Sequence, residues 1–114
     1  MGEQVENSTE SGASNWGIGL AQAVAAHGFG VPIEAMTADN AGTHQAIRAR
    51  HVAIYLSRMV LKLRATEIAR AFRRTHPAVL NACKRIEEAR EDPAFDRTVE
   101  WLETTLRRAA GGTP

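Results

Sequence analysis

The spacing of apolar residues predicts helices along almost the whole chain and almost no strand. The longest periodic segment runs from Thr43 to about Leu63 and carries two adjoining apolar stripes, which predicts a central helix buried on two sides. A last helix is expected to begin at Asp92-Pro93. The central stripes are Val52, Leu56, Met59, Val60 and Leu63, with Ile47, Ile54 and Leu61 beside them, and the last helix carries Phe95, Val99, Leu102 and Leu106, with Trp101 to one side.

Two shorter elements are expected before the central helix. The pattern over residues 16–27 favours a helix that Gly28 ends as a left-handed cap. Residues 31–36 suit a brief helix that has a proline near its first turn. Its Ile33 and Met36 are spaced so that both should reach the core.

Residues 66–86 combine two short amphipathic patterns with a tight basic turn, which is the arrangement of a helix-turn-helix. Because the residue before a proline avoids helical angles, His76 is expected to be the N-cap of the second helix and Pro77 its first residue. Ile68, Ala71 and Phe72 should anchor the first helix; the second should turn Val79, Leu80, Cys83 and Ile86 inward and Ala78, Asn81, Lys84 and Arg85 outward.

The two ends of the chain differ from its middle in composition. Residues 1–15 contain a single aliphatic side chain, Val5, and are expected to form a disordered tail because they cannot bury enough apolar surface. The Gly-rich residues 109–114 are expected to form a flexible C-terminal tail. Residues 16–108 are then one helical domain, which fits the usual size of a domain.

The charges are sorted along the sequence, although the whole chain has a net charge of only +1. The span from His44 to Arg90 holds 11 arginines and lysines against 3 glutamates, a net charge of +8, and acidic residues predominate on both sides. A basic centre of this kind is typical of a protein that binds a polyanion, because each neutralised phosphate releases condensed counterions. The alternative is an ordinary solvated helical surface.

The sequence gives poor support to an enzyme. The single cysteine, Cys83, occupies a core position, and His44 and His51 lie too far apart in sequence for a metal pair on one helix. We expect no metal, no cofactor and no catalytic residue. There is no phosphate-binding loop of the Walker type, so ATPase activity is not expected either. Without a leader or an apolar stretch long enough for a membrane, a cytoplasmic, nucleoid-associated protein is the expectation.

Two motifs, in order, resemble the C-terminal DNA-binding domain of the bacterial replication initiator DnaA. Residues 68–86 resemble the family pattern I-G-x-x-F-G-x-R-D-H-T-T-V-x-x-A-x-x-x-I, and residues 48–56 resemble R-P-R-x-x-A-M-Y-L. The likeness covers roughly residues 18–106 of what would be a small stand-alone protein. It implies an all-α fold, a compact bundle of about five or six helices with a helix-turn-helix, similar to DnaA domain IV and to Trp repressor.

The resemblance also implies a set of DNA contacts. Arg48 matches the family arginine that enters the minor groove, and Lys84 and Arg85 match a basic pair that contacts phosphates. Of the family's readers at the start of the recognition helix, only the histidine is unchanged, since Thr75, Pro77 and Ala78 replace an aspartate and two threonines. The full set of expected contact residues is Arg48, Arg50, Arg73, Arg74, Thr75, His76, Ala78, Asn81, Lys84 and Arg85, with Arg48 and Arg50 in the exposed first turns of the central helix.

These observations predict a monomer that binds double-stranded DNA with a sequence preference and regulates replication initiation or transcription, with replication or transcription proteins as further candidate partners and no membrane partner. The altered run from Thr75 to Ala78 leaves a second hypothesis open, in which a degenerate scaffold of the DnaA type docks other proteins. The turn lacks the family's glycine, so a left-handed residue there would have to carry a side chain.

Overall fold

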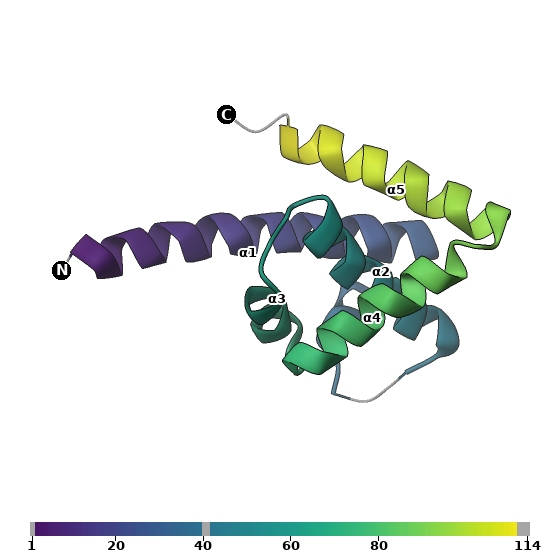
Figure 1. Ribbon diagram of the computed structural model, residues 1–114, viewed down its shortest axis with the longest axis horizontal. Coiled ribbons are helices and arrows are strands. Elements are labelled where there is room, and N and C mark those ends of the chain that lie inside the picture. Colours follow the sequence, from purple (N-terminus) through teal and green to yellow (C-terminus); the bar gives the residue numbers. More distant parts are fainter. Residues whose placement is uncertain (1, 40–41, 112–114) are drawn as a thin grey trace.

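The protein is all-helical in the part of the chain that the computed structural model describes, residues 2–39 and 42–111, with side chains described from Asn15 onward. Five α-helices and one 3-10 helix follow one another without a strand in these residues (Figure 1). Their bounds are α1 Gly2–Phe29, η1 Ile33–Met36, α2 His44–Met59, α3 Ala65–Phe72, α4 His76–Ala89 and α5 Pro93–Gly111. The predicted all-α bundle is confirmed.

Helix α2 is the centre of the fold and contacts each of the other elements. It begins after Thr43, whose side-chain oxygen accepts a hydrogen bond from the backbone N–H of Ala46 at 3.1 Å. Every residue from Val52 to Ser57 is buried, which confirms a helix covered on two sides. The helix ends at Met59 rather than near Leu63, and Met59 is 41% exposed although the pattern placed it in the apolar stripe.

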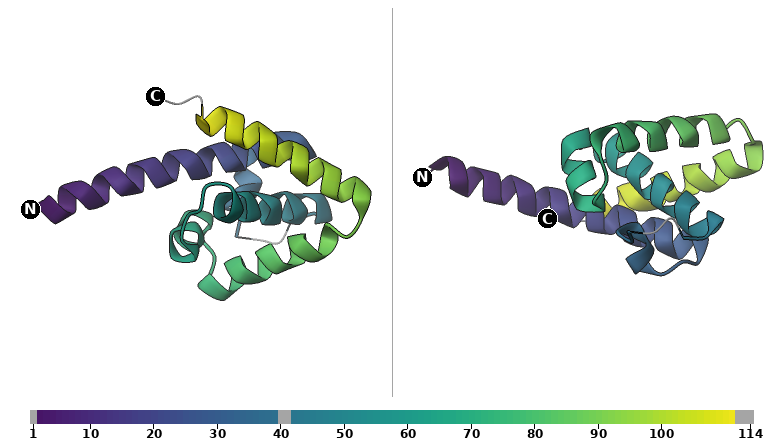
Figure 2. Two further views of the ribbon diagram at one scale, coloured as in Figure 1. Left: turned by 45° about the horizontal axis from the view of Figure 1, so that its top comes forward. Right: turned by 90° about the horizontal axis from the view of Figure 1, so that it is seen from below.

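Helix α1 is longer than the sequence pattern predicts. It begins at Gly2 instead of Trp16, and its first half projects beyond the rest of the molecule (Figures 1 and 2). No proline interrupts this segment, so its backbone can continue the helix that the later apolar residues start. The division into a tail of residues 1–15 and a domain of residues 16–108 stays a prediction.

The end of α1 shows why Gly28 is not its cap. The left-handed residue is Gly30, at φ +66°, and the N–H of Val31 closes the turn by donating to the carbonyl of Ala26 at 3.0 Å. Gly28 remains helical because α5 packs closely against it. A Cβ atom at Gly28 would lie 2.8 Å from a methyl group of Leu102.

The prediction that Ile33 and Met36 of η1 both reach the core is confirmed for only one of them. Met36 is buried and Ile33 is 45% exposed, so the single turn reaches the core through its C-terminal end. The segments on either side of it complete the connection between α1 and α2.

Helix α5 closes the core as predicted, with Phe95, Val99, Leu102 and Leu106 buried and Trp101 60% exposed. Arg90, just after α4, fastens this helix in place. Its guanidinium forms ion pairs with Asp96 and Glu103 and donates to the hydroxyl of Tyr55 at 3.1 Å. One side chain therefore joins α4, α5 and α2. The predicted tail from residue 109 continues α5 as far as Gly111, and residues 112–114 lie outside the described part of the chain.

Candidate nucleic-acid interface

The turn between α3 and α4 is left-handed without a glycine. Helix α3 ends at Phe72, and Arg73 adopts φ 58° and ψ 45°. The backbone N–H of Arg74 donates to the carbonyl of Ala69 at 2.9 Å and so completes the turn. An arginine in this conformation carries the steric cost that the sequence analysis anticipated.

The second helix of the motif begins one residue earlier than predicted. Thr75, not His76, is the N-cap, and its side-chain oxygen accepts from the backbone N–H of Ala78 at 3.2 Å. His76 is then the first helical residue and Pro77 the second. A threonine hydroxyl is a good acceptor for these unpaired N–H groups, and this outweighs the preference of His76 for extended angles. The oxygen of Thr75 is therefore already engaged before any DNA is present.

The faces of α4 agree with the prediction at most positions. Val79, Cys83 and Ile86 are buried, and Asn81, Lys84 and Arg85 are exposed. Ala78 is half-buried. Leu80 is the exception, since 43% of it is exposed and Ala82 takes the core position instead. Successive residues of an α-helix lie about 100° apart around its axis. Leu80 directly follows buried Val79, so its side chain points toward solvent, beside His76.

Two of the predicted contact arginines hold the fold together. Arg50 is only 5% exposed, and its Nε donates to the carbonyl of Ala35 at 2.9 Å, so the prediction of an exposed side chain is wrong. Arg74 donates from Nη2 to the carbonyl of Ala38 at 2.7 Å. Backbone carbonyls in an irregular connection need donors, and these two arginines supply them. Arg50 ties η1 to α2, and Arg74 ties the segment after η1 to the turn.

Arg48 is exposed, as predicted, but its side chain is not extended away from the protein. The guanidinium lies over the ring of Phe95 in α5, 4.4 Å from the ring centre. Arg73, in contrast, is exposed at the turn and has its left-handed backbone on the outside of the motif.

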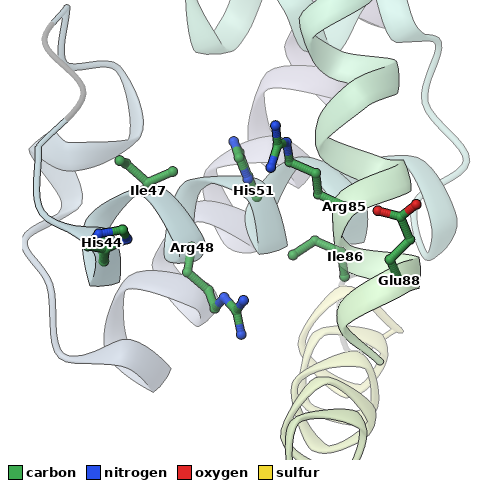
Figure 3. Close-up of a pocket in the computed structure, with 7 residues that line it drawn as sticks. All are labelled: His44, Ile47, Arg48, His51, Arg85, Ile86 and Glu88. Atoms are coloured by element: carbon green, nitrogen blue, oxygen red, sulfur yellow. The ribbon is translucent and has the colours of Figure 1, made fainter. Parts of the chain in front are cut away.

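A hollow of about 250 Å³ lies between the first half of α2 and the second half of α4 (Figure 3). The side chains of His51 and Arg85 meet across it from the two helices, whereas Arg48 turns toward α5 (Figure 3). The lining consists of His44, Ile47, Arg48, His51, Arg85, Ile86 and Glu88.

The electrostatics of His51 show that basic groups converge here. Partial burial lowers the pKa of its imidazole, and the positive charges of Arg85, Arg50, Arg48 and Arg74 lower that pKa further. These arginines come from α2, from the turn and from α4, and their positive charges all act on a single ring. The sequence analysis did not propose His51 or His44 as site residues; their spacing of two helical turns, with Arg48 between, was the available signal.

Groups suited to catalysis are scarce in the same region. Burial raises the pKa of the Cys83 thiol, which keeps the sulfur protonated and poorly nucleophilic. The described residues contain no group of three or more His, Cys, Asp and Glu side chains that could hold a metal ion. None of the helices described combines the length and the hydrophobicity that a bilayer-spanning segment needs.

Comparison with known proteins gives the same fold and the same motif. The model of the bacterial DnaA protein helix-turn-helix matches residues 20–86, more than half of the chain. The chain belongs to the DnaA helix-turn-helix family. A crystal structure described as a DNA replication initiation factor is 27% identical and superposes with a TM-score of 0.80. The similarity covers 95% of this chain and 33% of that one, so this chain spans about a third of that protein's length. No curated protein matches the sequence.

Membership of the DnaA helix-turn-helix family confirms the predicted resemblance and supports double-stranded DNA binding in the manner of that domain. The family model describes a DNA-binding motif and not a catalytic one. In the DnaA-type motif seen here, α3 is the supporting helix and α4 is the helix in the recognition position.

Proposed function

We propose that this protein binds double-stranded DNA with a preference for particular sequences, and that it regulates replication initiation or transcription by occupying its sites without ATPase activity. The observation that carries the proposal is the hollow between α2 and the second half of α4, where His51 lies between Arg48 and Arg85 (Figure 3) and the positive charges of Arg50 and Arg74 add to theirs. A strongly positive region next to a recognition helix supports a phosphate-contacting surface.

Exposure and hydrogen bonding support dividing the predicted contact residues into three groups. Arg48, Arg73, Lys84 and Arg85 are exposed; Arg48 remains the proposed minor-groove contact, and Arg73, Lys84 and Arg85 are the proposed phosphate contacts. Exposed His76 and Asn81, with half-buried Ala78, remain the proposed base-edge contacts, and Thr75 shapes the start of α4. Arg50 and Arg74 are assigned to holding the fold, because both already donate to backbone carbonyls.

The salt dependence of duplex binding tests this function. Log affinity should fall linearly with log salt, with a slope of about −0.9 for each phosphate contact. Replacing Lys84 and Arg85 together by glutamine should weaken binding and flatten that slope by about 1.8, because two contacts are lost. Fluorescence anisotropy with a labelled duplex, repeated over a range of salt concentrations, measures both quantities.

The matched control removes two positive charges elsewhere. Arg97 and Arg108 line a separate hollow on α5 together with exposed Trp101. Replacing both by glutamine changes the net charge by the same amount and should leave the slope nearly unchanged. Equal effects of the two double variants would show that total charge, and not the surface beside α4, determines binding.

The second hypothesis, a scaffold that docks other proteins, is favoured by the exposed Trp101 and by the replaced readers at Thr75, Pro77 and Ala78. It makes a different prediction in the same experiment. A docking module should bind duplex DNA weakly at every salt concentration, whereas a DNA-binding protein should bind tightly at low salt.

A further inference from the structure

The side chains that line the hollow between α2 and α4 have the chemistry to bind an anion. His51 lies half-buried at the junction of the two helices, and Arg85 and Arg48 lie on either side of it (Figure 3). His44, in the first turn of α2, stands at the same opening. Donors therefore predominate among the polar groups of the lining.

Glu88 is the one acidic side chain of the lining, and its carboxylate is the only group there that would repel an anion. In the described part of the chain it forms no ion pair with Arg85, since the ion pairs found there join Arg90 to Asp96 and Glu103. The guanidinium of Arg85 is consequently left available to a ligand that enters the hollow.

We propose that this hollow receives one phosphodiester group of the bound DNA duplex, and that His51 takes up a proton from solvent as the phosphate enters, so that DNA affinity rises as the pH falls. The proposal rests on the proposed function and adds to it a specific phosphate site and a proton linkage. A phosphodiester of the duplex is the ligand to which we commit, because the hollow adjoins the recognition helix and opens to solvent.

The physical reason is the charge balance around His51. In the free protein, burial and the charges of Arg85, Arg50, Arg48 and Arg74 hold the imidazole pKa below its usual value, so the ring is neutral at neutral pH. A phosphate placed in the hollow, between Arg48 and Arg85, offsets this repulsion. The protonated ring can then donate a charge-assisted hydrogen bond to a phosphate oxygen.

The sign of the linkage follows from the two pKa values of His51. Its pKa is higher in the complex than in the free protein, so the extra affinity is fully present below the free value and is lost as the pH rises through the bound value. Within that window affinity should change by up to about tenfold per pH unit, because one proton is taken up per complex.

An NMR titration of the His51 ring measures the event directly. The shift of its Cε1–H is followed against pH in the free protein, in the complex with a duplex, and in the presence of inorganic phosphate alone. We expect the pKa of His51 to rise by at least about one unit in the DNA complex and by much less with inorganic phosphate. Duplex affinity, measured between about pH 5.5 and 8, should rise toward the acid end.

Two variants provide the controls. His51→Gln keeps an N–H donor that does not titrate, so it should still bind DNA but with a much flatter pH dependence. His27→Gln removes an exposed histidine at the end of α1, outside the hollow, and should keep the wild-type pH dependence. Both variants keep His44 and His76, which is why the difference between the two variants, and not the absolute slope, isolates His51.

The outcomes separate this inference from the proposed function. DNA binding with an unchanged pKa of His51 overturns the inference and leaves the proposed function standing. An equal pKa rise with inorganic phosphate alone overturns the assignment to DNA, because the site then takes any free phosphate. No duplex binding at any pH or salt overturns both.

Discussion

Arginine has three different uses in this chain, and each depends on the side chain's neighbours. Arg50 and Arg74 donate to the carbonyls of a connection. Arg90 is part of an ion-paired cluster whose hydrogen bonds, despite its burial, raise its pKa above the usual value. Arg73 and Arg85 are exposed and available to a ligand. A residue's exposure and partners therefore decide whether its positive charge belongs to the fold or to the DNA surface.

At the same scale, Leu80 gives a prediction about base reading. It is exposed beside Pro77 near the start of α4, and an apolar side chain in the major groove packs against the methyl group of thymine. In a duplex selected from a random pool, replacing the thymines under α4 by uracil should therefore weaken binding by about 0.8 kcal/mol for each methyl group that Leu80 buries.

Competition binding with the thymine and uracil duplexes measures this difference. Leu80→Asn is the matched variant, because it removes the apolar contact and keeps a side chain of similar length. It should bind the two duplexes equally. A wild-type protein that does not distinguish thymine from uracil would show that Leu80 does not face the bases.

The residues of the site could be predicted from the sequence only in part. Lys84, Arg85 and Asn81 lie outward because their helix is amphipathic, and amphipathicity is visible in the sequence. The buried position of Arg50 could not be predicted, since it depends on a hydrogen bond to the carbonyl of Ala35 in η1, 15 residues away in sequence. The outward turn of Leu80 could not be predicted either, since both Leu80 and Ala82 are apolar and the structure shows that Ala82 takes the core position.

At the scale of elements, the helices with a strong apolar stripe were predicted well and their ends less well. Helix α5 has the stripe and the start that its sequence indicates. The end of α1 was wrong by two residues, because Gly28 and Gly30 are both suitable caps and only the packing of α5 distinguishes them. Helix ends depend on caps and neighbours, which a pattern of apolar residues does not contain.

Two of the glycines of α1, Gly19 and Gly28, give a prediction about stability. Gly28→Ala should destabilise the protein by about 1 kcal/mol, because the new Cβ would meet buried Leu102 in a packed core. Gly19→Ala is the matched control, since a Cβ there meets nothing within 4 Å. It should stabilise the protein by about 0.5–1 kcal/mol through helix propensity alone.

Urea unfolding followed by circular dichroism gives both free energies of unfolding. The opposite signs expected for the two substitutions follow from the contact between α1 and α5. Equal gains in stability would mean that α5 does not pack against Gly28 in solution.

At the scale of the whole molecule, the proposed DNA surface depends on the packing of α2 against α4. The first half of α2 faces the second half of α4, so residues more than thirty positions apart in sequence line one hollow (Figure 3). The excess of basic residues could be predicted from the sequence, but their convergence on His51 could not, because it depends on how the helices pack. Family membership and the shared fold with a longer replication initiation factor place this surface on a scaffold of the DnaA type.

The most direct test is to map the contact surface by NMR while a DNA duplex is added to the full chain. Backbone amides of residues 44–51 and 73–85 should shift together and saturate with the duplex, while the indole N–H of exposed Trp101 on α5 should stay unchanged. Shifts centred on Trp101 and its neighbours, with α4 and the start of α2 unaffected, would contradict the proposed DNA surface.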